Sequence, residues 1–246
     1  MFITRWLHRL LSPGKETRPD AAYDLWAAAY DHQPGNLMLD LDEIIFANFL
    51  QELDLGARTI ADVGCGTGRH WGKMIAAKPA HLIGFDVSAG MLDKLKEKFP
   101  SAETYLLAND RLPQLSDKSC DIVISTLAVA HIPEIKGALK EWDRVIKPGG
   151  DIIITDYHPD LLAKGAKRTF KHEGKLISVK NYVHPVEAIR ETARQLGWKE
   201  LRFTERVIDE SIKSHYEQQN ALPVFEKYKG IPIIYGIHLK KADDPA

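Results

Sequence analysis

Five short apolar runs alternate with helical segments through the middle of the chain. The runs are TIADVG, HLIGFDV, ETYLLA, CDIVIST and DIIITDY. Each is rich in strand-forming residues and lacks polar alternation, which is typical of strands buried on both faces of a parallel sheet. Strand–helix alternation of this kind predicts a doubly wound, Rossmann-like α/β fold with helices on both faces of the sheet.

Helices and two further strands complete this pattern. RFTERVID and IPIIYGIHLKK predict the last two strands, so the mostly parallel sheet is expected to have seven. Ser88 is placed to cap one helix, and Lys147-Pro148-Gly149-Gly150 ends another. Glu173-Gly174 predicts the turn of a small hairpin. Helices are expected at residues 21–30, 38–53, 68–78, 88–98, 134–146 and 185–197, with a helical stretch at 211–228.

The first 20 residues are distinct from this domain. Residues 1–11 place Ile3, Trp6 and Leu10 on one helical face, and residues 12–20 form a polar linker. Docking of this amphipathic segment on its own domain or a second subunit is the favoured interpretation, and membrane association at an interface is the alternative. No apolar run approaches the ~20 residues of a membrane-spanning helix.

Composition narrows the classes of function. The net charge of −1 provides no overall field toward nucleic acid. Two cysteines without a CxxC pair indicate a reducing compartment, so a cytoplasmic location is expected. No metal site is predicted, because the histidines lack ligand spacing and no H-E-x-x-H occurs.

A glycine-rich turn follows the first buried strand. Gly64, Gly66 and Gly68 permit a sharp turn and a close approach of ligand to backbone before a helix N-terminus. Asp86 ends the next strand, about 20 residues later, where a carboxylate can accept bonds from ribose hydroxyls. The spacing is G-x-G-x-G rather than G-x-G-x-x-G, and no P-loop occurs. The expected ligand therefore contains an adenosine and does not require a diphosphate.

At this point the chain resembles a known family. DVGCGTG, the acid in GFDVS, MLDKL, CDIVIST…AHI and RVIKPGG occur in the order found in class I S-adenosylmethionine-dependent methyltransferases. The resemblance is to the small-molecule branch related to ubiquinone and menaquinone C-methyltransferases, and covers roughly residues 20–155. It implies a cofactor-binding core at about 55–155 within a domain of residues 21–246. Insertions at about 156–184 and 209–230 would face a small-molecule acceptor.

The resemblance also implies roles for individual residues. The glycines would lie beneath the methionine part of the cofactor, and Asp62 would hold its amino group. Met91 would pack on the adenine, with an ordinary core position as the alternative. Tyr30 would close over the cofactor, with anchoring of its helix as the alternative. The expected cofactor-binding set is Tyr30, Asp62, Gly64, Cys65, Gly66, Gly68, Asp86, Val87, Met91, Asn109, Asp110 and Leu127.

The segment that contacts the adenine edge departs from the family pattern. The family usually has D-A-E-x-L-P after the third strand, and this chain has Ala108-Asn109-Asp110-Arg111-Leu112-Pro113. Ala108 stands where the acid is expected. Asn109 or Asp110 must therefore supply the hydrogen bond.

Methyl transfer requires alignment and exclusion of water, and a base only if the acceptor must lose a proton. The catalytic candidates are His131 after the fourth strand, His158 after the fifth and Tyr30. A loop-holding role is the alternative for both histidines. Ser125-Thr126-Leu127-Ala128 replaces the [N/D]-P-P-[Y/F] of nucleobase N-methyltransferases, which argues against that activity. Two other functions stay open: a non-methylating scaffold or cyclase-like member of the fold, and a nicotinamide-dependent oxidoreductase.

Overall fold

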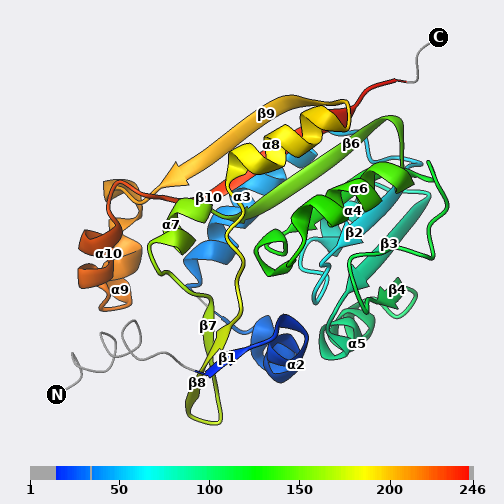
Figure 1. The fold of residues 1–246 in the computed structure, drawn as a ribbon. Helices are drawn as coiled ribbons and strands as arrows, with labels where there is room; N and C mark the ends of the chain where they lie inside the picture. Colours follow the sequence, from blue (N-terminus) through cyan, green and yellow to red (C-terminus); the bar gives the residue numbers. More distant parts are fainter. Residues whose placement is uncertain (1–14, 34, 244–246) are drawn as a thin grey trace.

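A seven-stranded sheet forms the centre of the molecule (Figure 1). The computed structural model describes residues 15–33 and 35–243, so the amphipathic segment 1–11 lies outside the described residues. The strand order is β4-β3-β2-β5-β6-β10-β9, and β10 is antiparallel to both of its neighbours. The predicted Rossmann-like sheet is confirmed. Its strands are β2 (Thr59–Val63), β3 (His81–Asp86), β4 (Glu103–Leu106), β5 (Cys120–Thr126), β6 (Ile146–Tyr157), β9 (Trp198–Val207) and β10 (Pro232–Lys241).

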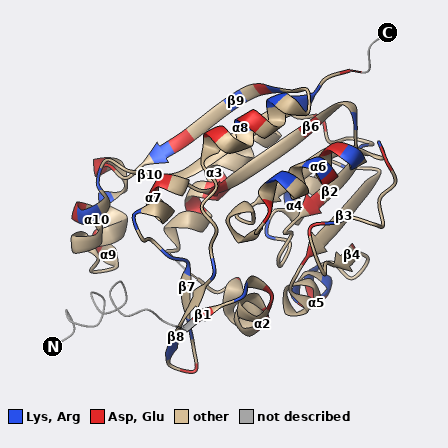
Figure 2. Ribbon diagram, in the orientation of Figure 1, with Lys and Arg blue, Asp and Glu red and all other residues tan. Residues whose placement is uncertain are grey.

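Helices cover both faces of this sheet, because its central strands are apolar on both sides. Ile122 and Ile124 of β5 belong to the core beneath one set of helices, and Val123 belongs to the opposite core. Acidic and basic residues are interspersed along the outer helices α6 and α8 (Figure 2). The first face carries α3 (Leu37–Leu50), α4 (Trp71–Ala76) and α5 (Ala89–Lys98); the second carries α6 (Ile135–Val145) and α8 (Val186–Gln195).

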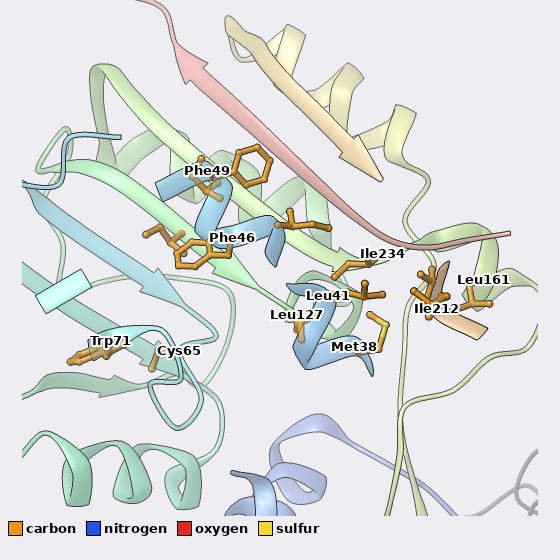
Figure 3. Close-up of a cluster of buried hydrophobic side chains, with 14 of the residues drawn as sticks. Met38, Leu41, Phe46, Phe49, Cys65, Trp71, Leu127, Leu161, Ile212 and Ile234 are labelled. Atoms are coloured by element: carbon orange, nitrogen blue, oxygen red, sulfur yellow. The ribbon is translucent and has the colours of Figure 1, made fainter. Parts of the chain in front are cut away.

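Helix α3 packs unusually close to β10. Phe46 and Phe49 are fully buried and point from α3 toward the strands (Figure 3). Gly236 of β10 permits this approach, since a Cβ there would lie 2.5 Å from Cγ2 of Ile45 and 2.6 Å from Cε2 of Phe49. The absence of a side chain at position 236 therefore allows α3 to pack closely against β10.

A buried carboxylate ties the same helix to two other elements. Asp42 of α3 is fully buried and accepts hydrogen bonds from Arg69, His70 and Thr155. Burial alone raises its pKa, but the His70 hydrogen bond and the Arg69 charge outweigh it and lower the pKa to about 2. The ionised group holds α3 to the segment before α4 and to β6.

A smaller unit covers the carboxyl edge of the sheet. Helix α2 (Pro19–Tyr30) packs against a three-stranded sheet of order β1-β8-β7, and these elements lie together in Figure 1. The hairpin predicted at Glu173-Gly174 is confirmed, and both residues have positive φ. The expected linker at 12–20 differs, since part of it forms β1 and pairs in parallel with β8. The strands are β1 (Lys15–Thr17), β7 (Thr169–His172) and β8 (Lys175–Val179).

The helical stretch expected at 211–228 is divided into shorter pieces. Asn220 has a φ of 52°, a left-handed conformation that ends one helix before the next begins. Ala221 and Phe225 then turn into the core beside α3. The pieces are η2 (Glu210–Ile212), α9 (Lys213–Gln218) and α10 (Leu222–Tyr228); η1 (Val129–His131) and α7 (Pro159–Ala163) are the remaining short helices of the described chain.

Replacement of Gly236 by valine is expected to force α3 away from β10. Overpacking of this kind costs about 1–3 kcal/mol of the unfolding free energy. Gly137→Ala on α6 is the control, because its Cβ would meet only Cβ of Glu134 at 3.9 Å. That change should stabilise the helix by about 0.5–1 kcal/mol. Urea unfolding of both variants tests the pair, and equal stabilities would contradict the close packing.

Candidate functional site

A cavity of about 620 Å³ lies at the carboxyl ends of the parallel strands, between the sheet and α2. This is the edge at which ligands bind in open α/β folds. Its lining residues form two groups by their origin in the chain, one from the end of β3 and the segments that follow β2, β3 and β4, and one from α2 and the segments that follow β5 and β8. The first contains Gly64, Gly66, Asp86, Met91, Asn109 and Asp110, and the second contains Tyr23, Tyr30, His131, Lys180 and Tyr182.

The turn after β2 forms the floor of the first group. Gly64 has a φ of 79°, and its N–H donates to the carbonyl of Phe85 over 2.7 Å. A Cβ on Gly64 would lie 2.3 Å from Cβ of Ala128, so the turn and the loop after β5 touch here. Gly66 differs, because a Cβ there would meet nothing within 4 Å. Gly66 therefore leaves open space where it borders the cavity.

Asp86 stands at the end of β3 beside this turn and is 8% exposed. Its Oδ2 accepts from the Gly66 N–H over 2.8 Å, and its Oδ1 accepts from the Ser88 N–H over 2.9 Å. Burial raises the pKa of Asp86 to about 6, although these backbone bonds oppose the shift. A carboxylate has about four acceptor positions, so Asp86 keeps the capacity to accept from a ligand beside its bonds to the backbone.

Three residues expected at the cofactor lie behind the cavity wall. Asp62 accepts a 2.8 Å bond from the indole of Trp71, and burial raises its pKa to about 6. Gly68 gives room to Leu95 and Trp71, which would lie 2.9 and 3.2 Å from a Cβ. Cys65 is buried in the core on the same side. In this structure Asp62, Cys65 and Gly68 support the turn without lining the cavity, whereas Tyr30, Val87 and Leu127 do line it.

The adenine-edge candidates both line the cavity. Oδ1 of Asn109 accepts a 2.9 Å bond from the Arg111 N–H, which uses this side chain to form the loop. Asp110 is half-buried, and burial together with Glu134 raises its pKa. Asp110 is therefore the freer acceptor of the two.

Helix α2 closes the cavity because two aspartates anchor it. Asp24 accepts from the Ser88 hydroxyl over 2.6 Å and from the Gly90 N–H over 2.9 Å. Asp31 accepts from the Thr67 hydroxyl over 2.6 Å. Tyr23 and Tyr30 precede these aspartates, so the same seven-residue spacing directs both phenols to the cavity. The repeated Tyr-Asp pair in YDLWAAAYD is the sequence signal that could have identified Asp24 and Asp31 as anchors.

Tyr23 and His131 form the polar wall of the second group. The Nδ1 of His131 donates to the carbonyl of Lys180 over 3.0 Å, and its Nε2 accepts from the Tyr23 hydroxyl over 2.8 Å. Burial, reinforced by the Arg168 charge, lowers the pKa of His131 to about 4. The imidazole is therefore neutral at pH 7, with both nitrogens engaged.

Buried polar groups hold the loop that carries His131. Asp156 accepts from the N–H groups of Ala130 and Tyr157, each over 2.6 Å. Burial raises the pKa of Asp156 to about 7, against the effect of these bonds. Leu127 has a φ of 53°, a strained conformation for a residue with a side chain, and its N–H donates to the Thr155 carbonyl.

His158 lies away from the cavity, at the start of α7. Its Nδ1 accepts from the Asp160 N–H over 3.2 Å, and its Nε2 lies 3.4 Å from Glu205. This arrangement corresponds to the loop-holding alternative. Within the described chain, no cluster of His, Cys, Asp or Glu could hold a metal ion, and no helix is long and apolar enough to span a membrane.

Arg168 was not among the candidates, yet it lies directly behind Tyr23 and Tyr30. It is 2% exposed and donates to the phenol oxygens of Tyr30 and Tyr157 over 2.8 and 3.0 Å. No local pattern marks it, because the loop before β7 meets α2 only in the folded chain.

Comparisons of sequence support one family. Residues 61–154 match the family described as methyltransferase domain. The ubiquinone/menaquinone biosynthesis C-methyltransferase of Syntrophotalea carbinolica is 33% identical over 59% of this chain and 62% of its own length. The malonyl-[acyl-carrier protein] O-methyltransferase of Yersinia pestis is 37% identical over 39% of this chain and 35% of its length. Across four curated relatives, the chain spans 34%, 62%, 35% and 52% of their lengths.

Solved structures share the fold. An S-adenosylmethionine-dependent methyltransferase structure from Listeria monocytogenes has a TM-score of 0.63 at 20% identity, with 80% of this chain and 96% of that chain covered. The [4+2]-cyclase SpnF has the same TM-score at 19% identity, over 94% of this chain and 98% of its own. At these identities, the similarity establishes the architecture.

The buried carboxyl of Asp156 should make stability depend on pH. Its raised pKa means that the folded chain retains a proton that the unfolded chain loses near pH 4. The unfolding free energy should therefore fall as pH rises toward 7, by about 1.4 kcal/mol for each unit of pKa shift. Urea unfolding from pH 5 to 8 should show a smaller fall in Asp156→Asn than in wild type. Asp93→Asn, an exposed change on α5, is the control, and parallel pH profiles for wild type and Asp156→Asn would contradict the assignment.

Proposed function

We propose that this chain, a class I S-adenosylmethionine-dependent methyltransferase, transfers the cofactor's methyl group to a small-molecule acceptor in the cavity beneath α2. The observation that carries the proposal is the continuity of the cavity. One space joins Gly66 and Asp86 to Tyr23, Tyr30 and His131. A cofactor site therefore opens directly onto a wall that can hold an acceptor.

The residues of the first group fit S-adenosylmethionine. The open space at Gly66 accommodates a ligand against the backbone, and the remaining lone pairs of Asp86 suit the two ribose hydroxyls. Met91 lines the cavity where the adenine is proposed, and Asp110 is proposed to accept from its amino group. When bound, the cofactor supplies an electrophilic methyl carbon: the acceptor provides the electron pair of the new bond, and the electrons of the broken C–S bond remain on sulfur.

The residues of the second group would orient the acceptor and exclude water. Helix α2, anchored by Asp24 and Asp31, covers the reacting region and brings Tyr23 and Tyr30 against it. Alignment and water exclusion are the main contributions that a protein makes to such a displacement. His131 is proposed to act through Tyr23, since the phenol occupies its Nε2.

By their names, the two relatives methylate different atoms, carbon in one case and oxygen in the other. Their names therefore leave the acceptor of this chain to be argued from its own residues. A methyltransferase structure and the cyclase structure both share this architecture, so transfer of the methyl group itself must be measured.

Gly66→Val should remove cofactor binding while Gly174→Val should not. Both glycines have positive φ and open space around a Cβ, so both variants carry a similar backbone strain. Only Gly66 borders the cavity, where the valine side chain would fill ligand space. Calorimetric titration with S-adenosylhomocysteine should show at least a tenfold loss, roughly 1.4 kcal/mol, for Gly66→Val alone. Equal affinities for the two folded variants would contradict the placement of the cofactor.

Methyl transfer is tested with methyl-labelled S-adenosylmethionine and a fractionated small-molecule extract. Label should enter a small-molecule fraction, with formation of an equal amount of S-adenosylhomocysteine. Gly66→Val is the negative control, and Gly174→Val should retain the transfer. Binding of the cofactor without labelled product or S-adenosylhomocysteine in any fraction would instead favour a non-methylating role.

A further inference from the structure

Arg168 is a buried cation without a carboxylate in contact among the described residues. Its guanidinium lies 5.0 Å from the ring centre of Trp26 and donates to the phenols of Tyr30 and Tyr157. Its Nε is buried and has no hydrogen-bond partner in the part of the chain that the structure describes. A guanidinium removed from water normally needs an anion or a full set of acceptors to offset its lost hydration.

The phenols around Arg168 do not provide that negative charge. Burial raises the pKa of Tyr157, and it raises that of Tyr23 well above its ordinary value, so both stay neutral near pH 7. Asp156 is the nearby acid and interacts electrostatically with Arg168, but its hydrogen bonds go to the Ala130 and Tyr157 N–H groups and, within the described residues, it forms no ion pair with the guanidinium. No carboxylate therefore contacts the guanidinium within the described residues, so its positive charge can balance an anion in the cavity.

Tyr30 connects this charge to the cavity. It lines the cavity, and its oxygen accepts from Nη2 of Arg168 over 2.8 Å. The phenol hydrogen is therefore directed away from Arg168, and within the described chain no protein acceptor takes it. A phenol polarised by an adjacent cation is a stronger donor to an anionic oxygen than to a neutral one.

We propose, on the basis of the proposed function, that the methyl acceptor carries a carboxylate that binds the Tyr30 hydroxyl and is charge-balanced by Arg168. Arg168 lies 5.7 Å from the ring centre of Tyr23, whose hydroxyl bonds His131, so this site belongs to the second group of cavity residues. Lys180 also lines the cavity and adds positive charge to it, whereas Arg18 in the same lining is paired with Asp20 over 2.7 Å.

The state of His131 agrees with an acceptor that arrives ionised. Both of its ring nitrogens are engaged, by Tyr23 and by the Lys180 carbonyl, and burial lowers its pKa to about 4. Such an imidazole is a weak base. A carboxylate already carries the electron pair that it donates, so it requires no proton transfer.

The probes are benzoate and its neutral counterpart benzamide, titrated into protein saturated with S-adenosylhomocysteine. Wild type should bind benzoate at least tenfold more tightly than benzamide. Arg168→Met should abolish this preference, Arg168→Lys should retain part of it, and Tyr30→Phe should reduce it by several-fold. Arg190→Met is the matched control, because Arg190 lies over Phe203 away from the cavity and should leave the preference unchanged.

Two results would overturn the inference: no preference for benzoate in wild type, or a full preference in folded Arg168→Met. If Arg168→Met does not fold, Tyr30→Phe decides, and an unchanged preference there has the same meaning. The first titration, of S-adenosylhomocysteine alone, separates the two proposals. Failure of that binding counts against the proposed function, whereas loss of the benzoate preference with binding intact counts against the inference alone.

The cofactor's own carboxylate is the competing partner for Arg168. Binding of S-adenosylhomocysteine is therefore compared with binding of 5′-methylthioadenosine, which lacks the amino-acid group. If Arg168 serves the acceptor, Arg168→Met should change both affinities by less than threefold. A tenfold loss confined to S-adenosylhomocysteine would assign Arg168 to the cofactor and overturn the inference.

Discussion

The turn after β2 is the constraint on which the site depends. Gly64 donates to the Phe85 carbonyl and presses against Ala128, while the Gly66 N–H binds the carboxylate of Asp86. These contacts join the ends of β2 and β3 to the loop after β5. Because a side chain on Gly64 would collide with Ala128, only glycine permits this junction. The floor of the cavity, the position of Asp86 and the path toward His131 all follow from it.

The opposite wall depends on polar anchors rather than apolar packing alone. Asp24 and Asp31 fasten α2 to the loops that begin α5 and follow β2. The same helix stacks Trp26 on Phe170 with ring centres 4.4 Å apart, which attaches the small sheet. Buried polar groups are costly unless they are bonded, so this wall is specified by partners from several segments. Within this wall, Nε of Arg168 and Oγ of Ser178 are buried without a hydrogen-bond partner among the described residues.

The cavity positions of residues near the glycine turn were predictable from the sequence. Those of residues brought together by the smaller unit of α2, β1, β7 and β8 were not. Gly66 and Asp86 follow from strand–turn–helix order, because parallel strands bring their carboxyl ends to one edge. His131 was placed correctly on the cavity, but its bonds to Tyr23 and Lys180 join residues 108 and 49 positions away. His158 has the same position after a strand, yet α7 takes its side chain as a cap. A position just after a strand thus predicts that a residue lies at the carboxyl edge of the sheet. Its hydrogen-bond partners decide whether its side chain faces the cavity or holds a loop.

By itself, the sequence determined the alternation of strands and helices along the chain, the glycine turn and the acid that faces this turn. These features depend on local backbone preferences and on periodic burial. Only the tertiary structure decided that β1 joins the cap sheet, that Asp62 and Cys65 lie behind the wall, and that Arg168 is buried beside three phenols. The burial of a charge and the protonation of a histidine depend on groups distant in the chain. The local sequence does not show which of those distant groups come into contact in the folded chain.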